Sequence, residues 1–255
     1  MKDFTLNAYR QYLRAIKASY PNILCFSDFF SLDELPYSFI LIRHDVDRKP
    51  GNALKMALLE SEMGICSTYY FRTRKHVFKP GIISEIAGAG HEIGYHYESL
   101  SDAKGKHQVA LKDFEQNLKK LRNIVPVRTI AMHGSPLSPY DNRDIWRDSL
   151  NHEYLKNILE ISGEVYLDID YSGIAYITDT GRNWYSGRAN RRDMVNSAVT
   201  RDFKNGETLL DCFNKACYPK AVFQIHPERW ADSITEYYIQ SALDLFANII
   251  KTIVR

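Results

Sequence analysis

Acidic and imidazole side chains follow directly after short apolar runs at several places in this chain. Carboxylates and imidazoles move protons near neutral pH, and both bind divalent metal ions. The sequence therefore predicts acid–base chemistry, metal chemistry, or both, at the point where these side chains meet. The side chains in question are Asp45, Asp47, His96, His133 and His226.

The first two of these residues are close enough in sequence to act together. Asp45 and Asp47 are two positions apart, so in an extended segment both carboxylates point to the same side. Two adjacent carboxylates repel each other, and a bound dication is the simplest way to keep both ionised. An alternative stays open for Asp47, which precedes Lys49-Pro50 and could instead cap the helix predicted to follow.

The elements that must position these groups alternate between strand and helix. Apolar runs predict strands over 39–42, 67–71, 92–96, 129–132 and 221–225, and a β-rich stretch over 164–178. Apolar residues at helical spacing predict helices over 5–19, 52–63, 81–88, 106–122, 206–217 and 232–253. In the last helix, one apolar stripe is made by Ile234, Tyr238, Ala242, Leu245, Phe246, Ile249 and Ile253.

Repeated strand-then-helix order predicts an α/β fold with a mostly parallel sheet. An open doubly wound sheet and a closed barrel both fit this pattern. In either architecture the carboxyl ends of the strands lie on one face, so the five ionisable side chains are expected to converge there. No composition shift marks a boundary, so we expect one domain over 1–255, with 1–37 as a helical extension packed on it.

Three segments together resemble the polysaccharide deacetylase family (NodB-like, carbohydrate esterase family 4). They are Arg43-His44-Asp45-Val46-Asp47, Gly90-His91-Glu92-Ile93-Gly94-Tyr95-His96 and Ala221 to His226. The resemblance implies a distorted (β/α) barrel. It also implies Asp45 as the general base, Asp47 and His96 as metal ligands, and His226 as the general acid.

One departure from the family concerns the metal. The family pattern His-x-x-x-His has Leu100 at its second histidine here, and a leucine cannot bind a metal. His133 is the expected replacement because it ends the next strand, with Glu98 as the alternative ligand. Zn is the expected metal, with Ni or Co as alternatives. A degenerate site without metal also stays open.

A second departure is the missing arginine of the family's Arg-x-Pro motif, and Arg72 or Arg182 could take its place beside the base or the substrate. Two segments, 168–171 and 179–184, mix acids, an arginine and aromatic residues. Such mixtures suit sugars, which pack on aromatic rings and hydrogen-bond to polar groups. Asp170 and Trp184 are therefore predicted to bind substrate together with these arginines, although Trp184 could equally anchor a core.

Bulk properties limit the partners and the compartment. A net charge of +2 gives no electrostatic argument for nucleic acid. Four cysteines show no Cys-x-x-Cys spacing, and Cys212 and Cys217 lie in a helical stretch, which favours reduced thiols. No apolar run is long enough for a secretory signal or a membrane span. These features predict a cytoplasmic protein.

The resemblance implies a metal-dependent hydrolase that removes an acetyl group from the amide nitrogen of an amino sugar. A cytoplasmic member would meet nucleotide- or lipid-linked amino sugars, which points to surface-polysaccharide biosynthesis. Two alternatives remain: an allantoinase-like amidohydrolase of small molecules, and a glycan-binding relative without catalysis.

Overall fold

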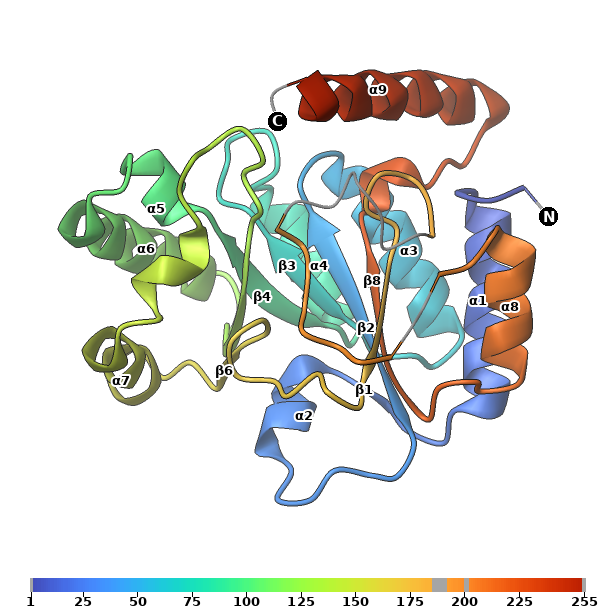
Figure 1. The fold of residues 1–255 in the computed structure, drawn as a ribbon, viewed down its shortest axis with the longest axis horizontal. Helices are drawn as coiled ribbons and strands as arrows, with labels where there is room; N and C mark the ends of the chain where they lie inside the picture. Colours follow the sequence, from blue (N-terminus) through green and yellow to red (C-terminus); the bar gives the residue numbers. More distant parts are fainter. Residues whose placement is uncertain (1, 185–191, 200–201, 254–255) are drawn as a thin grey trace.

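A curved parallel sheet forms the centre of the molecule in a computed structural model, which describes residues 2–184, 192–199 and 202–253. Its strand order is β6-β5-β4-β3-β2-β8-β7, and β1 pairs with the N-terminal part of β2. Each of these pairings is parallel. The sheet curls into a half-barrel with helices around it (Figure 1). The predicted α/β class and distorted barrel are thereby confirmed.

The strands of the described residues are β1 (Ile23–Leu24), β2 (Phe39–Val46), β3 (Thr68–Phe71), β4 (Glu92–Tyr97), β5 (Thr129–Met132), β6 (Gly163–Glu164), β7 (Ala175–Thr178) and β8 (Lys220–Ile225). The α-helices are α1 (Leu6–Ser19), α2 (Phe26–Ser31), α3 (Pro50–Glu62), α4 (Pro80–Gly88), α5 (Ser99–Asp102), α6 (His107–Arg122), α7 (Ser149–Asn157), α8 (Gly206–Asn214) and α9 (Ile234–Ile253). Two 3-10 turns complete the set, η1 (Asn142–Ile145) and η2 (Pro227–Arg229).

Most predicted elements are confirmed, with three differences. Strand β2 continues to Val46, so Asp45 lies inside the strand rather than after it. The β-rich stretch 164–178 is only the short strands β6 and β7 with turns between them. Helices α2, α5 and α7 and strand β1 were not predicted, because each is too short to show a clear periodicity.

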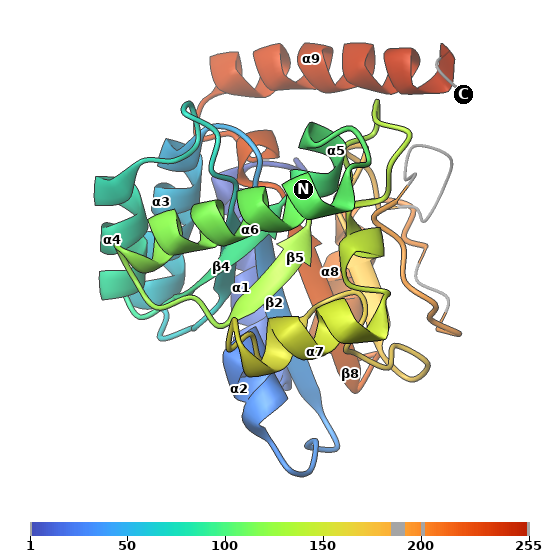
Figure 2. The same ribbon diagram turned by 90° about the vertical axis from the view of Figure 1, so that its left-hand side faces the viewer.

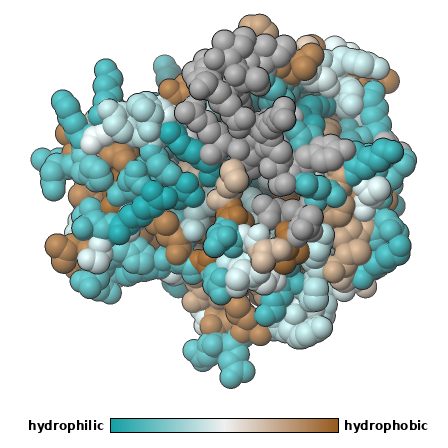
Figure 3. All heavy atoms as spheres, in the orientation of Figure 1, coloured by the Kyte–Doolittle hydropathy of each residue, from teal (hydrophilic) through white to brown (hydrophobic). Residues whose placement is uncertain are grey.

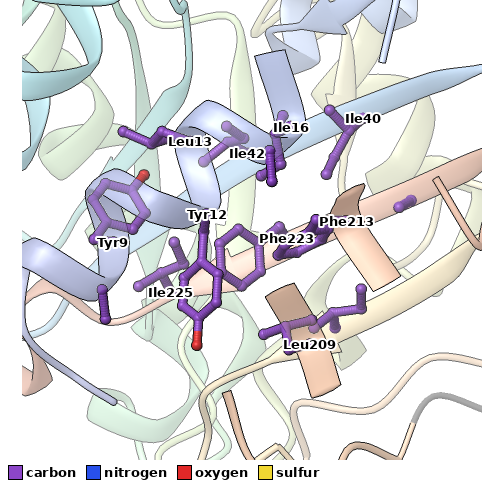
Figure 4. Packing of buried hydrophobic residues seen from close by; sticks show 14 of the residues in the cluster. Tyr9, Tyr12, Leu13, Ile16, Ile40, Ile42, Leu209, Phe213, Phe223 and Ile225 are labelled. Atoms are coloured by element: carbon purple, nitrogen blue, oxygen red, sulfur yellow. The ribbon is translucent and has the colours of Figure 1, made fainter. Parts of the chain in front are cut away.

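Alternation along β2 decides which side chains enter the half-barrel. Ile40 and Ile42 point to the convex side, where they pack with Leu13 of α1 and with Leu209 and Phe213 of α8 (Figure 4). Because successive strand residues point to opposite faces, the residues between them point to the concave side. That side therefore receives Phe39, Leu41, Arg43 and Asp45.

The concave side is apolar at its base and polar towards the carboxyl ends of the strands. Phe39, Leu41, Tyr70, Ala131 and Val222 form one buried cluster at the base. On the opposite, convex side, α3, α4 and α6 cover strands β3 to β5 (Figure 2). The base of the half-barrel is thus filled, and its polar end is left for the site.

Gly94 in β4 lies where a side chain would collide with the inner layer. A Cβ there would meet the Tyr70 ring at 2.2 Å from Cε1. We expect Gly94→Ala to lower the free energy of unfolding by about 1–3 kcal/mol, the usual effect of overpacking a core. Gly81→Ala in α4 is the matched control because its Cβ meets nothing within 4 Å. Urea unfolding of both variants and of the wild type checks this. A free energy of unfolding of Gly94→Ala equal to that of the wild type would contradict it.

Two cysteines correct the expectation of reduced thiols. Cys25 and Cys66 form a disulfide with a Cα–Cα distance of 6.2 Å, which ties the start of α2 to the segment before β3. Cys212 and Cys217 are free. Spacing could not reveal the bridge, because its partners are 41 residues apart. Among the described residues, no helix combines the length and apolar character that crossing a bilayer requires.

Candidate acid–base and metal site

The five ionisable side chains predicted from the strand ends do converge. They line one cavity of about 270 Å³ at the carboxyl ends of the strands, together with Arg72. A larger hollow of about 770 Å³, beside the segment 122–128, carries none of them. The smaller cavity is therefore the candidate site. Its predicted members are Asp45, Asp47, His96, His133 and His226.

Asp45 is 3% exposed and held by two fixed donors. Arg43 donates from Nε to Oδ1 and from Nη2 to Oδ2, both at 2.8 Å, and Gln224 donates from Nε2 to Oδ2 at 3.0 Å. A carboxylate oxygen can accept two hydrogen bonds. Oδ1 of Asp45 thus keeps one free lone pair, directed from a carboxylate that cannot rotate.

Arg43 is itself fully buried and braced by the inner aromatic layer. It donates from Nη2 to the hydroxyl of Tyr166 at 3.0 Å, and its guanidinium lies 4.7 Å from the centre of that ring. Arg43, two residues before Asp45 on the same strand face, therefore does what was expected of Arg72 or Arg182. The signal was present in the sequence, because the two-residue period that pairs Asp45 with Asp47 also includes Arg43.

Asp47 carries a buried oxygen that has no hydrogen-bond donor among the residues that the structure describes. Its Oδ1 lies 3.4 Å from Nε2 of His96 and 3.5 Å from Nε2 of His133. Burial opposes ionisation of Asp47, but the two imidazoles outweigh it and hold the pKa of its carboxyl well below the usual range. Asp47 does not cap α3, whose N-cap is Lys49 without a side-chain cap.

His96 presents one defined nitrogen to this oxygen. Its Nδ1 lies 2.9 Å from the backbone oxygen of Ala131, so Nδ1–H donates and Nε2 faces the cavity. Such a backbone acceptor is the usual partner of a metal-binding histidine, because it fixes the tautomer and the ring orientation. The prediction of His96 as a ligand is consistent with this arrangement and stays a prediction.

Glu98 supports His133 rather than facing the cavity centre. Its carboxylate accepts from Nη2 of Arg72 at 2.7 Å and from Nε of Arg74 at 2.6 Å, and it lies 3.2 Å from Nδ1 of His133. Burial opposes protonation of His133, but Asp47 and Glu98 outweigh it and raise the pKa of this imidazole to about 9. The predicted substrate contact Arg72 is thus occupied by Glu98.

The donor chemistry of this cluster fits a divalent cation. Ligand distances of about 2.0–2.2 Å in a tetrahedral site place neighbouring donor atoms roughly 3.3–3.6 Å apart. Both imidazole distances to Asp47 lie in that range. Across the described residues, however, no three His, Cys, Asp or Glu side chains form a group that could hold a metal as they stand. Metal binding therefore stays a prediction.

His226 forms a second ionisable pair with a residue that the sequence did not assign to it. Its Nδ1–H donates to Oδ1 of Asp179 at 2.6 Å, and Asp179 also accepts from its backbone N–H. Burial and the charge of Arg229 oppose protonation of His226, but Asp179 outweighs both and raises the pKa of the imidazole. Nε2 of His226 lies 3.4 Å from Nε2 of Gln224, which also contacts Asp45.

Two further carboxylates line the cavity and were not predicted. Asp193 accepts hydrogen bonds from Tyr166 at 2.8 Å and Thr178 at 3.1 Å. Glu228 is 2% exposed, and within the described part of the chain its Oε2 has no hydrogen-bond partner. Burial, with Asp47 nearby, raises the pKa of Glu228 to about 7. Neither residue belongs to a strand or α-helix among the described elements, and Glu228 lies in the 3-10 turn η2.

Three predicted substrate contacts lie elsewhere. Trp184 is 4% exposed in the convex core, stacked on Phe4 at 5.2 Å, so it anchors the core. Arg182 donates to the backbone oxygen of Arg229 at 2.7 Å and contacts α9. Asp170 is exposed and accepts from Ser172. None of the three lines the cavity, and their contact with substrate stays a prediction.

Leu100 packs in the apolar core and does not face the cavity. It lies in α5, is 2% exposed, and belongs to the apolar cluster around Phe114 and Tyr97. A histidine there would face this cluster rather than the cavity in the present backbone. The imidazole nearest to His96 is instead His133, with ring centres 5.3 Å apart.

No family model and no curated protein matches the chain. Three solved structures are similar to it. A family 4 carbohydrate esterase from Bacillus anthracis has 12% identity and a TM-score of 0.39 over 82% of this chain and 74% of that one. One from Streptococcus mutans has 13% identity and a TM-score of 0.47 over 93% and 90%. The esterase domain of a multidomain xylanase from a Trinervitermes trinervoides hindgut metagenome has 12% identity and a TM-score of 0.36 over 80% and 91%.

Proposed function

We propose that this protein is a hydrolase that removes an acetyl group from the amide nitrogen of an amino sugar. The observation that carries the proposal is a fixed carboxylate and a raised-pKa imidazole in one cavity. Asp45 is held in place by Arg43, and His226 is an imidazole whose pKa is raised by Asp179. A carboxylate and an imidazole placed in this way suit a base and an acid acting in one reaction.

The reaction balances with these two residues. Asp45 takes a proton from a water molecule whose oxygen forms a bond to the acyl carbon. The carbon–nitrogen bond then breaks as His226 donates a proton from Nε2 to the nitrogen. The products are acetate and a free amine, and an amine leaves poorly unless it receives that proton. Proton transfer through water resets the two side chains for another cycle.

The metal is part of the proposal. Asp47, His96 and His133 would hold a Zn, Ni or Co ion, which would supply Lewis-acid polarisation of the acyl carbonyl. Glu98 would orient His133 from behind, as second-layer carboxylates commonly do. Arg72 and Arg74 would in turn keep Glu98 in place.

The proposal extends to the substrate and the compartment. A nucleotide- or lipid-linked amino sugar used in surface-polysaccharide biosynthesis suits a cytoplasmic enzyme of this kind. The Cys25–Cys66 disulfide bears against a reducing compartment, because disulfides persist mainly where the surroundings are oxidising. Thiol counting on protein released directly from cells into an alkylating agent tests the location.

Metal content tests the ligand set. We expect the purified chain to bind about one Zn per molecule and His96→Ala to lose it, since one of three donors is gone. Glu98→Gln should keep the metal but weaken its affinity about 10–100-fold, the usual effect of removing a supporting carboxylate. His107→Ala removes an exposed histidine and serves as the control. Full metal retention in His96→Ala would show that the assignment is wrong.

Activity tests the reaction itself. Acetate release should be measured with N-acetylglucosamine oligomers and UDP-N-acetylglucosamine. Allantoin, the competing substrate class, carries no acetyl group, so its turnover should be followed by the loss of allantoin itself. Release from either acetamido sugar supports the proposal. Turnover of allantoin alone would favour the small-molecule amidohydrolase, and sugar binding without turnover by the metal-loaded protein would favour a glycan-binding relative.

A further inference from the structure

Helix α9 turns its polar side inward and its apolar side outward. It crosses the molecule above the carboxyl ends of the strands in both views (Figures 1 and 2). The two polar residues at its centre, Gln240 and Asp244, are 1% and 6% exposed. An ordinary surface helix buries its apolar stripe instead. The reversed arrangement therefore needs a cause.

Specific polar contacts fix this orientation of α9. Glu236 accepts from Asn52 at 2.9 Å and from Lys49 at 3.3 Å. Further along the helix, Asp244 pairs with Arg182 at 3.3 Å. These contacts anchor both halves of the inner face. Rotating the helix to bury its apolar side would separate Glu236 from Lys49 and Asp244 from Arg182.

The outward side of α9 is apolar over a wide arc. Six large side chains there are between 48% and 73% exposed, and Figure 3 shows apolar side chains at the top edge of the molecule. At about 100° per residue, they span roughly 180° of the helix circumference. The side chains of Ile249 and Ile253, predicted for the same stripe, lie outside the described part. The six are Ile234, Tyr238, Ile239, Leu243, Leu245 and Phe246.

We propose that this face of α9, the six residues just named, docks on the surface of a lipid bilayer. Its width favours a plane over a single helix, since a helix–helix contact buries a stripe of about 100° and would leave the rest in water. A helix lying in the bilayer interface buries about half its circumference in the acyl boundary. The described acids of α9, Glu236 and Asp244, face inward, and the Lys2 ammonium lies 4.6 Å from the centre of the Tyr238 ring, where a cation would meet the lipid headgroups.

Docking through α9 would place the cavity beside the lipid. Arg48, which lines the cavity, lies 3.9 Å from Asp244 on the inner face of α9. Arg182, which also contacts Asp244, donates to the backbone of Arg229 in the cavity wall. If the proposed function holds, a lipid-linked amino sugar would reach the site without leaving the membrane surface. The docking itself does not depend on that function.

Vesicle binding tests the docking independently of any hydrolysis. The full chain should sediment with phosphatidylcholine vesicles and do so nearly equally at 0.1 M and 0.5 M NaCl, because apolar insertion is not screened by salt. The double variant Leu245→Glu/Phe246→Glu should lower the bound fraction at least about tenfold. The matched control is Leu150→Glu/Ile158→Glu, which charges two residues of similar exposure, 73% and 65%, elsewhere on the surface.

Three results would overturn the docking. One is a folded wild-type chain that does not sediment with vesicles. Another is a Leu245→Glu/Phe246→Glu variant that binds as well as the wild type. The third is a wild-type dimer that this variant converts to a monomer while neither form binds vesicles, which would assign the face to a second copy. A wild-type chain that binds vesicles but releases no acetate from acetamido sugars would count against the proposed function alone.

Discussion

Asp45→Asn should lower acetate release by about 10²–10⁴-fold, the range that loss of a general base produces, while metal content stays unchanged. The reason is geometric. Asp45 is fixed by Arg43 and Gln224 with a lone pair of Oδ1 left free, and an amide at this position cannot take a proton from water. Initial rates and metal analysis on the same preparation give both readings.

Stability must be separated from chemistry in this variant. Asparagine would remove the carboxylate that pairs directly with the buried Arg43, and breaking a buried ion pair costs about 3–5 kcal/mol. Arg43→Gln/Asp45→Asn removes both charges and should recover part of that stability without recovering activity. Near-normal turnover by folded Asp45→Asn would exclude the base role, and recovery of activity in the double variant would make the effect one of folding.

Much of the fold was predictable because strand-then-helix order and apolar runs are local signals. The convergence of Asp45, Asp47, His96, His133 and His226 followed from one rule about parallel strands, and the cavity confirms it. Their roles are not confirmed by that convergence. They depend on hydrogen-bond partners, which local sequence does not specify.

The partner of His226 shows what local sequence lacks. Asp179 lies 47 residues away, directly after β7, and the two meet because β7 pairs with β8. Periodicity identifies both strands but not their adjacency in the sheet. The place of Trp184 in the convex core was open for a related reason. The sequence shows an aromatic residue near acids, but only the path of the chain after β7 decides whether it faces the cavity or that core.

Helix α9 shows a different kind of failure. The apolar stripe was predicted correctly as a pattern, and such a stripe normally marks the buried side. Here the polar residues Gln240 and Asp244 are buried, and Leu245 and Phe246 are exposed. The apolar stripe in the sequence does not tell whether that side of the helix packs on the rest of the protein or on a partner outside it. Only the fixed contacts of Asp244 distinguish the two.

His226→Gln should also lower acetate release by about 10²–10⁴-fold, because the leaving nitrogen would receive no proton from a positioned acid. The acid must be protonated to act. Asp179 raises the pKa of His226, so the protonated form persists above the ordinary histidine pKa of about 6.5. We therefore expect activity to persist to higher pH than an ordinary histidine would allow and to fall as pH rises through this raised value.

Asp179→Asn should change the pH dependence of the rate in a way that a merely structural role of His226 would not produce. Without the carboxylate, the largest contribution that raises the pKa of His226 is lost, and burial and Arg229 lower this pKa against the smaller effect of Glu228. The alkaline limb of the rate profile should then move to lower pH, while rates well below that limb change less. Thermal melting shows whether the variant is folded, since Asp179 also accepts from Trp230. A profile that keeps the wild-type alkaline limb in folded Asp179→Asn would remove His226 from the role of acid.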